Sequence, residues 1–96
     1  MTSDIVWSKS AQSDLARIDD YYRDIDPHFA NRTGRNALAA ARFLLINPFA
    51  GPKIEGTRYR KWYVPDTPFL LFYRPENGRL LIQRVRHYRE DWQPIL

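Results

Sequence analysis

The dipeptide Asn77-Gly78 lies between two apolar runs and is the strongest short signal for a β-hairpin that a sequence can contain. The run before it, Phe69 to Arg74, is almost continuously apolar, which indicates an interior strand. The run after it is apolar from Leu80 to Val85. Side chains with guanidinium, imidazole and phenol groups then gather at its end: Arg84, Arg86, His87, Tyr88 and Arg89. This end is either a binding or catalytic site held on a rigid strand or a solvated strand end.

A helix is predicted near the N-terminus, with Ser8 or Ser10 as its cap. Apolar residues recur there at steps of four, three, four and three, which places them on one helical stripe: Ala11, Leu15, Ile18, Tyr22 and Ile25. Four carboxylates flank the stripe, and we expect them to form a solvated helix face: Asp14, Asp19, Asp20 and Asp24. The helix is expected to stop at Asp26-Pro27.

A second helix is predicted from Pro27 to about Ile46, ending before Asn47-Pro48. One of its sides carries Phe29, Thr33, Ala37, Ala40 and Leu44. Two strands complete the fold: a short one at Asp4 to Trp7, and one at Arg58 to Val64 that is rich in aromatic and basic residues and follows a Gly/Pro loop. The order β-α-α-β-β-β predicts a two-layer α+β fold, a helical hairpin packed on a largely antiparallel sheet. We expect a single domain over residues 1–96.

Strand alternation predicts which side chains share a face of the sheet. Arg58, Arg60, Trp62 and Val64 should lie on one side of their strand. Arg84 and Arg86 should share a side with Ile82, and His87 should lie on the side of Val85. The expected core consists of Leu15, Ile18, Leu44, Trp62, Phe69, Leu71, Tyr73, Leu80 and Ile82.

The positive charge is concentrated in the second half of the chain. Residues 1–52 carry six basic and six acidic side chains, whereas residues 53–96 carry nine basic and five acidic ones. Twelve of the fifteen basic residues are arginine, which binds phosphate and carboxylate groups in a bidentate way. An anionic partner is therefore expected, either nucleic acid or an acidic protein segment. The alternation of basic and aromatic residues at 58–64 fits both.

Several classes of site are not expected. The chain has no cysteine, and His28 and His87 lie far apart, so we expect no metal centre, and no cofactor is expected. No apolar run approaches the roughly 20 residues that span a bilayer, and the N-terminus does not look like an export signal, which predicts a cytoplasmic protein. The hydrolytic chemistry that remains is metal-free RNA cleavage. His87, Tyr88 and an arginine could supply the base, acid and cation, with Glu55 as an outside candidate.

The sequence resembles the RelE/ParE superfamily, toxins of bacterial type II toxin–antitoxin systems. Three stretches carry the resemblance, and together they cover nearly the whole chain. The first is the helix pattern Ser8, Ala11, Asp14, Leu15, Ile18 and Tyr22 (or Tyr21). The second is Asn47-Pro48, the Gly/Pro loop and Arg60-Lys61-Trp62. The third is Pro68 to Arg74, then Ile82, Arg84-Val85 and His87-x-Arg89-x-Asp91-Trp92.

The ParE-like branch fits better than the RelE-like branch. Its strand Pro-aromatic-aliphatic-aliphatic-Phe-Tyr-Arg matches Pro68 to Arg74. The resemblance implies a toxin without catalytic turnover that inhibits DNA gyrase and forms a hetero-oligomer with a ParD-like antitoxin. The residues expected to bind partners are Arg58, Arg60, Lys61, Trp62, Arg84, Arg86, Arg89 and Trp92.

The alternative is a RelE-like ribosome-dependent mRNA endonuclease, with the ribosome and mRNA as partners. Its catalytic residues would be His87, Tyr88, Arg84 and Arg89. RelE-like chains usually carry a lysine pair before the second strand, where this chain has Lys53 alone, and an arginine where this chain has Pro68-Phe69. Tyr88 after the histidine favours the nuclease, because ParE-like chains often have a small residue there. A third possibility is an inactive relative that binds only its antitoxin and operator DNA.

Overall fold

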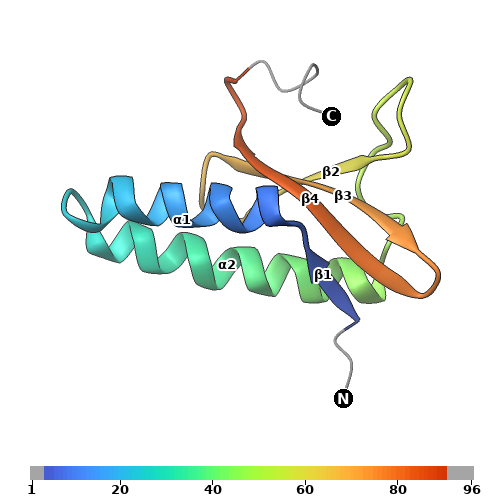
Figure 1. Cartoon of the computed structure of the whole chain (residues 1–96), viewed down its shortest axis with the longest axis horizontal. Coiled ribbons are helices and arrows are strands. Elements are labelled where there is room, and N and C mark those ends of the chain that lie inside the picture. The colour runs from blue at the N-terminus through green and yellow to red at the C-terminus, as the bar shows by residue number, and fades with distance from the viewer. Residues whose placement is uncertain (1–3, 91–96) are drawn as a thin grey trace.

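The computed structural model describes residues 4–90 as a helical hairpin packed on a four-stranded sheet (Figure 1). The elements in chain order are β1 Ile5–Trp7, α1 Lys9–Arg23, α2 Pro27–Ile46, β2 Arg60–Tyr63, β3 Phe69–Glu76 and β4 Arg79–His87. The strand order is β1-β4-β3-β2; β1 is parallel to β4, and the other neighbours are antiparallel. The predicted α+β fold is confirmed, although β1 and β2 are shorter than the predicted strands. No helix within residues 4–90 has the length and apolar character needed to cross a membrane.

Both helices begin at a side-chain cap. The hydroxyl of Ser8 accepts a hydrogen bond from the Ala11 amide at 2.9 Å. The carboxylate of Asp26 accepts one from the Phe29 amide at 3.1 Å, and Pro27 occupies the start of α2. Each cap satisfies an amide that has no partner within its own helix, which fixes where the helix begins.

The turn between the helices removes one residue from the predicted apolar stripe. α1 ends at Arg23, and the amides of Ile25 and Asp26 both donate to the carbonyl oxygen of Tyr22. Ile25 lies in the turn that follows the end of α1, and it is 66% exposed. The prediction that Ile25 continues the buried stripe is therefore wrong.

The core lies between the helical hairpin and one face of the sheet. Six residues of the predicted core are buried there: Leu44, Phe69, Leu71, Tyr73, Leu80 and Ile82. The other three pack against them and are partly buried: Leu15, Ile18 and Trp62. A smaller cluster of Ile54, Leu70 and Phe72 occupies the opposite face, as the alternation of β3 requires.

The hairpin at Asn77-Gly78 forms as predicted and joins β3 to β4. Asn77 has φ 51° and Gly78 has φ 78°. A two-residue turn of this kind needs positive φ at both positions, which glycine adopts freely and asparagine more readily than most residues.

The pairing of β3 with β4 contains a shift of one residue. Phe72 pairs with Arg84, but the next residue, Tyr73, pairs with Ile82. Gln83 is thus an extra residue on β4, as in a β-bulge.

This extra residue changes which side chains of β4 face the helices. Ile82 and Val85 both belong to the core between sheet and helices. Arg84 and Arg86 alternate with Val85, so they start from the opposite face. The prediction that they share a side with Ile82 is wrong, because simple alternation does not allow for the bulge. His87 lies on the side of Val85 as predicted, and its ring meets Phe69 of the core.

Tyr73 attaches the predicted loop after α2 to the sheet. Its side chain is fully buried, and its hydroxyl donates to the carbonyl of Pro48 at 2.9 Å and accepts from the amide of Gly51 at 3.0 Å. A Cβ atom at Gly51 would lie 2.4 Å from the carbonyl oxygen of Lys61, so the close approach requires glycine. The loop is therefore held by one phenol and one residue without a side chain.

We expect Tyr73→Phe to lower the free energy of unfolding by about 1–3 kcal/mol, because the two backbone groups lose their partner. Burial raises the pKa of Tyr73 above its ordinary value of 10.0, although the Gly51 amide and the Arg60 charge oppose the shift. The folded protein therefore keeps this proton to higher pH than the unfolded chain does. The wild type should lose stability as the pH rises from about 10 towards the folded pKa, and the variant should lack this loss.

Urea unfolding at pH 8 and pH 11 measures both effects. Tyr63→Phe is the control, because the Tyr63 side chain is exposed. Equal stability and equal pH dependence for Tyr73→Phe and wild type would show that the phenol does not hold the loop.

Candidate functional site

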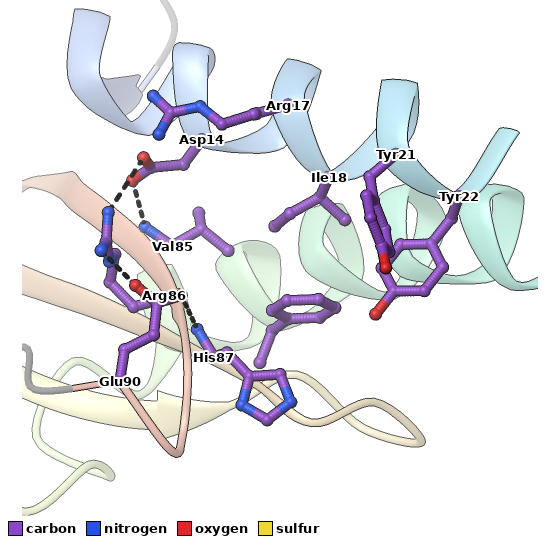
Figure 2. Close-up of a pocket in the computed structure, with 10 residues that line it drawn as sticks. Asp14, Arg17, Ile18, Tyr21, Tyr22, Val85, Arg86, His87 and Glu90 are labelled. Atoms are coloured by element: carbon purple, nitrogen blue, oxygen red, sulfur yellow. Dashed lines mark hydrogen bonds and ion pairs between the residues drawn. The ribbon is translucent and has the colours of Figure 1, made fainter.

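Asp14 lies where α1 meets β4 (Figure 2). Its side chain is only 3% exposed. Its carboxylate accepts hydrogen bonds from Arg84 Nε at 2.8 Å, Arg84 Nη2 at 2.9 Å and the Val85 amide at 2.9 Å. The Arg86 guanidinium forms a longer ion pair with it, at 3.7 Å. The prediction that Asp14 belongs to a solvated helix face is therefore wrong.

The shortness of β1 explains this arrangement. β1 ends at Trp7, opposite Ile82, so within residues 4–90 β4 has no neighbouring strand on that side beyond Ile82. The start of α1 follows this edge: the Ser8 amide donates to the Ile82 carbonyl and the Ser8 hydroxyl donates to the Gln83 carbonyl. Asp14 continues the series by accepting the buried Val85 amide, which would otherwise lose a partner.

The position of Asp14 in the sequence indicates that it is buried, although Asp14 was grouped with the carboxylates that flank the apolar stripe. Asp14 follows Ala11 by three residues and precedes Ile18 by four, so it lies within the apolar stripe. A carboxylate on the buried side of a helix needs a cationic or hydrogen-bonded partner. Its position would have indicated a buried ion pair, but not which arginine completes it.

The ion pair keeps Arg84 charged but neutralises it locally. The hydrogen bonds that Arg84 donates to Asp14 raise the pKa of Arg84 above its ordinary value, burial lowers it, and the charges of Asp14 and Glu90 raise it further. The Arg84 side chain is 16% exposed and directs its Nε and Nη2 donors to Asp14. It therefore offers little positive charge to another molecule.

A turn at residues 87–90 closes the end of β4. The Glu90 amide donates to the His87 carbonyl at 3.0 Å, and the Glu90 carboxylate accepts from the His87 amide and pairs with Arg86. His87 Nδ1 accepts from the Arg89 amide at 3.1 Å. The rings of His87 and Tyr88 stack at 4.9 Å, and Arg89 Nε donates to the Tyr88 hydroxyl at 2.8 Å. The predicted cluster therefore ends in a turn that is held by these hydrogen bonds. Tyr88 and Arg89 are the exposed residues of the cluster.

A pocket of about 300 Å³ opens between α1 and this turn (Figure 2). Ile18, Tyr21, Tyr22 and Phe69 form apolar and aromatic walls. Arg17, Arg86 and His87 bring polar groups to its rim, beside Asp14 and Glu90. A mixed lining of this kind suits a protein segment with an apolar side chain and nearby charges.

Comparison with known protein families decides what kind of protein this is. The family described as ParE toxin of type II toxin-antitoxin system, parDE, matches residues 5–92. The chain belongs to the ParE toxin family. A solved structure described as the chromosomal ParDE TA system from P. aeruginosa has the same fold, with a TM-score of 0.75. The two sequences are 24% identical, and the aligned region covers 91% of this chain and 96% of the chain in the solved structure. No curated protein matches.

The remaining residues expected to bind partners lie on β2 and just before it. β3 separates β2 from β4, so the structure does not join them to Arg84, Arg86 and Arg89 in one site. Arg60 is turned inward: its Nη1 donates to the Gly51 carbonyl at 2.9 Å and its guanidinium lies over the Phe49 ring. Trp62 stacks on Phe43 at 5.4 Å. Arg58 is exposed, and Lys61 is half-buried.

Trp92, the last of the expected binding residues, lies outside the described residues. Within residues 4–90, no group of three or more His, Asp or Glu side chains is arranged to hold a metal ion. The β4 end of this ParE toxin therefore offers a hydrogen-bonded turn, a pocket with apolar walls and charged groups beside them, and exposed Tyr88 and Arg89. Such a surface can bind a partner without a bond being broken.

Proposed function

We propose that this ParE toxin inhibits DNA gyrase in the cytoplasm and that a ParD-like antitoxin neutralises it in a hetero-oligomeric complex. The family match and the basic second half of the chain support the proposal. The solved structure of similar fold is described as a chromosomal ParDE TA system. A toxin of this kind binds its target and has no catalytic turnover of its own.

The observation that favours binding over RNA cleavage is the bonding of Arg84. A metal-free nuclease needs a cation that faces the scissile phosphate as charge develops on it. The Arg84 guanidinium instead contacts both carboxylate oxygens of Asp14 and is mostly buried. Using it for catalysis would require breaking a buried ion pair, which is costly.

The proton-transfer pair of the nuclease alternative is also engaged within its own turn. His87 Nδ1 accepts the Arg89 amide, and the Tyr88 hydroxyl accepts from Arg89 Nε. These contacts give His87 and Tyr88 a structural role that needs no proton transfer. The same turn leaves Arg89 and Tyr88 exposed to a protein partner.

We further propose that the antitoxin contributes an acidic, amphipathic segment that binds the pocket between α1 and the end of β4. Its apolar side chains would meet Ile18, Tyr22 and Phe69, and its acidic groups would meet Arg17. A specific interface of this kind buries about 1,000 Å² or more in total.

One reconstituted assay tests the toxin and the antitoxin together. Purified toxin should inhibit DNA supercoiling by gyrase and stabilise cleaved DNA, and the antitoxin encoded beside it should restore supercoiling. The same toxin should leave mRNA on translating ribosomes uncut. Full gyrase activity at saturating toxin, with mRNA cleaved, would replace the proposal with the nuclease. No effect in either assay would indicate an inactive relative.

A conservative double variant separates the two chemistries at the same residues. His87→Gln with Tyr88→Phe keeps planar groups and an acceptor for the Arg89 amide but removes the capacity to transfer protons. We expect gyrase inhibition to weaken by about tenfold or less, because the variant keeps the ring next to Arg89 and loses only the hydrogen bond to the Tyr88 hydroxyl. A nuclease would lose about 10²–10⁴-fold in rate. The measurement is inhibition of supercoiling and growth arrest at matched expression.

A further inference from the structure

β2 forms one edge of the sheet, and only part of that edge is covered. The loop before β2 bonds its first half: Lys53 bridges to Arg60, and the Lys61 amide donates to the Pro52 carbonyl at 3.2 Å. The cover ends there. Edge strands are usually short, twisted or covered because their free backbone groups pair with other chains.

Tyr63 occupies the uncovered half of this edge. The Val64 amide donates to the Phe69 carbonyl, so Val64 bonds towards β3. Backbone groups alternate between the two sides of an antiparallel strand, so the amide and carbonyl of Tyr63 point outward, away from β3. In residues 4–90 no further strand lies on that side. One donor and one acceptor are thus presented in the spacing that a second strand uses.

An apolar pocket of about 410 Å³ lies beside these groups. Pro52, Pro65, Trp62 and Leu70 line it, together with Lys61 and Tyr63. The Tyr63 side chain is 56% exposed, and the stack of Trp62 on Phe43 fixes one wall. A pocket of this size accepts a large apolar side chain.

The charges near the pocket leave a small positive excess. Lys61 lines the pocket, the exposed Lys53 follows the lining residue Pro52, and the exposed Asp66 follows the lining residue Pro65. The loop before β2 adds the exposed Arg58 and Glu55, which cancel in charge. A partner with carboxylates beside its apolar anchor would complement this charge.

We propose that the β2 edge binds an extended acidic peptide segment, which adds a strand next to Tyr63 and places one large apolar side chain in the pocket. A single-stranded nucleic acid would satisfy the charges and stack on the tyrosine, but it has no backbone amide and carbonyl in strand spacing. The outward groups of Tyr63 therefore favour a peptide. The site is separated by β3 from the pocket at the end of β4, so it stands whether or not gyrase is the target.

The test uses the full-length toxin and a synthetic probe, the peptide Asp-Glu-Val-Leu-Val-Glu-Asp. Three versions are compared: the unmodified peptide, one with N-methylation at the residues that flank leucine, and one with leucine replaced by alanine. We expect the unmodified peptide to bind and each change to weaken binding by about tenfold, which is the size of one or two net hydrogen bonds or a lost apolar anchor. Hydrogen exchange of the Tyr63 amide should slow when the peptide binds.

Charge variants locate the site. Lys53→Glu combined with Arg58→Glu should weaken peptide binding by tenfold or more, whereas Arg35→Glu, an exposed arginine of α2, should not. Binding that is insensitive to N-methylation, or no protection of the Tyr63 amide, would overturn the proposal. So would a single-stranded oligodeoxythymidine that protects this surface where the peptide does not.

Discussion

Replacing Asp14 with alanine is expected to lower the free energy of unfolding by about 3–5 kcal/mol, the cost of removing one partner of a buried ion pair. The variant leaves Arg84 without its counter-charge and the Val85 amide without its acceptor. A small domain has only about 5–15 kcal/mol of stability, so this would be a large fraction of it. Urea unfolding followed by circular dichroism measures the difference.

Two companions separate the charge from the hydrogen bonds. Asp14→Asn keeps an oxygen acceptor for one donor but removes the charge, so it should cost less than alanine. Asp20→Ala removes an exposed carboxylate from the same helix and should change stability by about 0.5 kcal/mol or less. A cost below about 1 kcal/mol for Asp14→Ala would mean that the ion pair does not organise the junction of α1 and β4.

The pH dependence of this contribution follows from Arg84. Its pKa is raised above its ordinary value in the folded state, chiefly by the hydrogen bonds that it donates to Asp14. The stabilisation from Arg84 is therefore fully present below the unfolded pKa and is lost only as the pH rises through the folded pKa. Near neutral pH the arginine side of the pair does not titrate.

The helical hairpin was predictable because its signals are local. The buried side of α2, with Ala37, Ala40 and Leu44, follows directly from 3.6-residue periodicity. Asn77-Gly78 fixed the β3–β4 hairpin for the same reason, since two adjacent residues carry the whole requirement for positive φ.

The features that were missed depend on contacts between distant segments. Gln83 is an ordinary strand residue, and only pairing with β3 makes it the extra residue of a bulge. Asp14 and Arg84 are 70 residues apart in the sequence. Composition marked both as charged but could not show that each neutralises the other.

Only part of the candidate site could be predicted, because the rest also depends on contacts between distant segments. The clustering of Arg84, Arg86, His87, Tyr88 and Arg89 at the end of β4 was correct. The sequence could not show which of these side chains are free to bind a partner. Arg84 forms an ion pair with Asp14, and Arg86 forms ion pairs with Asp14 and Glu90. The sequence also grouped the basic residues of β2 with them, although β3 lies between the two strands. Which of these residues contact partners stays a prediction.

The difference between committed and exposed arginines leads to the second large effect. Arg89 is exposed at the tip of the turn, lies over the Tyr88 ring at 5.4 Å and donates to its hydroxyl. An arginine held by an aromatic ring is the type of residue that dominates protein interfaces. If the proposed function is correct, Arg89→Ala should weaken gyrase inhibition by about 2 kcal/mol or more, roughly 30-fold.

The measurement is the toxin concentration that halves DNA supercoiling, together with the free energy of unfolding of each variant. Arg89→Ala should raise the toxin concentration that halves supercoiling. It should leave the free energy of unfolding within about 0.5 kcal/mol of the wild-type value, because the residue is exposed. Arg84→Ala should do the reverse: it should lower stability by leaving Asp14 unpaired and spare inhibition at temperatures where the variant stays folded. Arg35→Ala, an exposed arginine on α2, should change neither quantity. Should Arg89→Ala inhibit gyrase as well as the wild type does, the turn at the end of β4 would not be the surface that contacts the target, and the β2 edge would become the next surface to test.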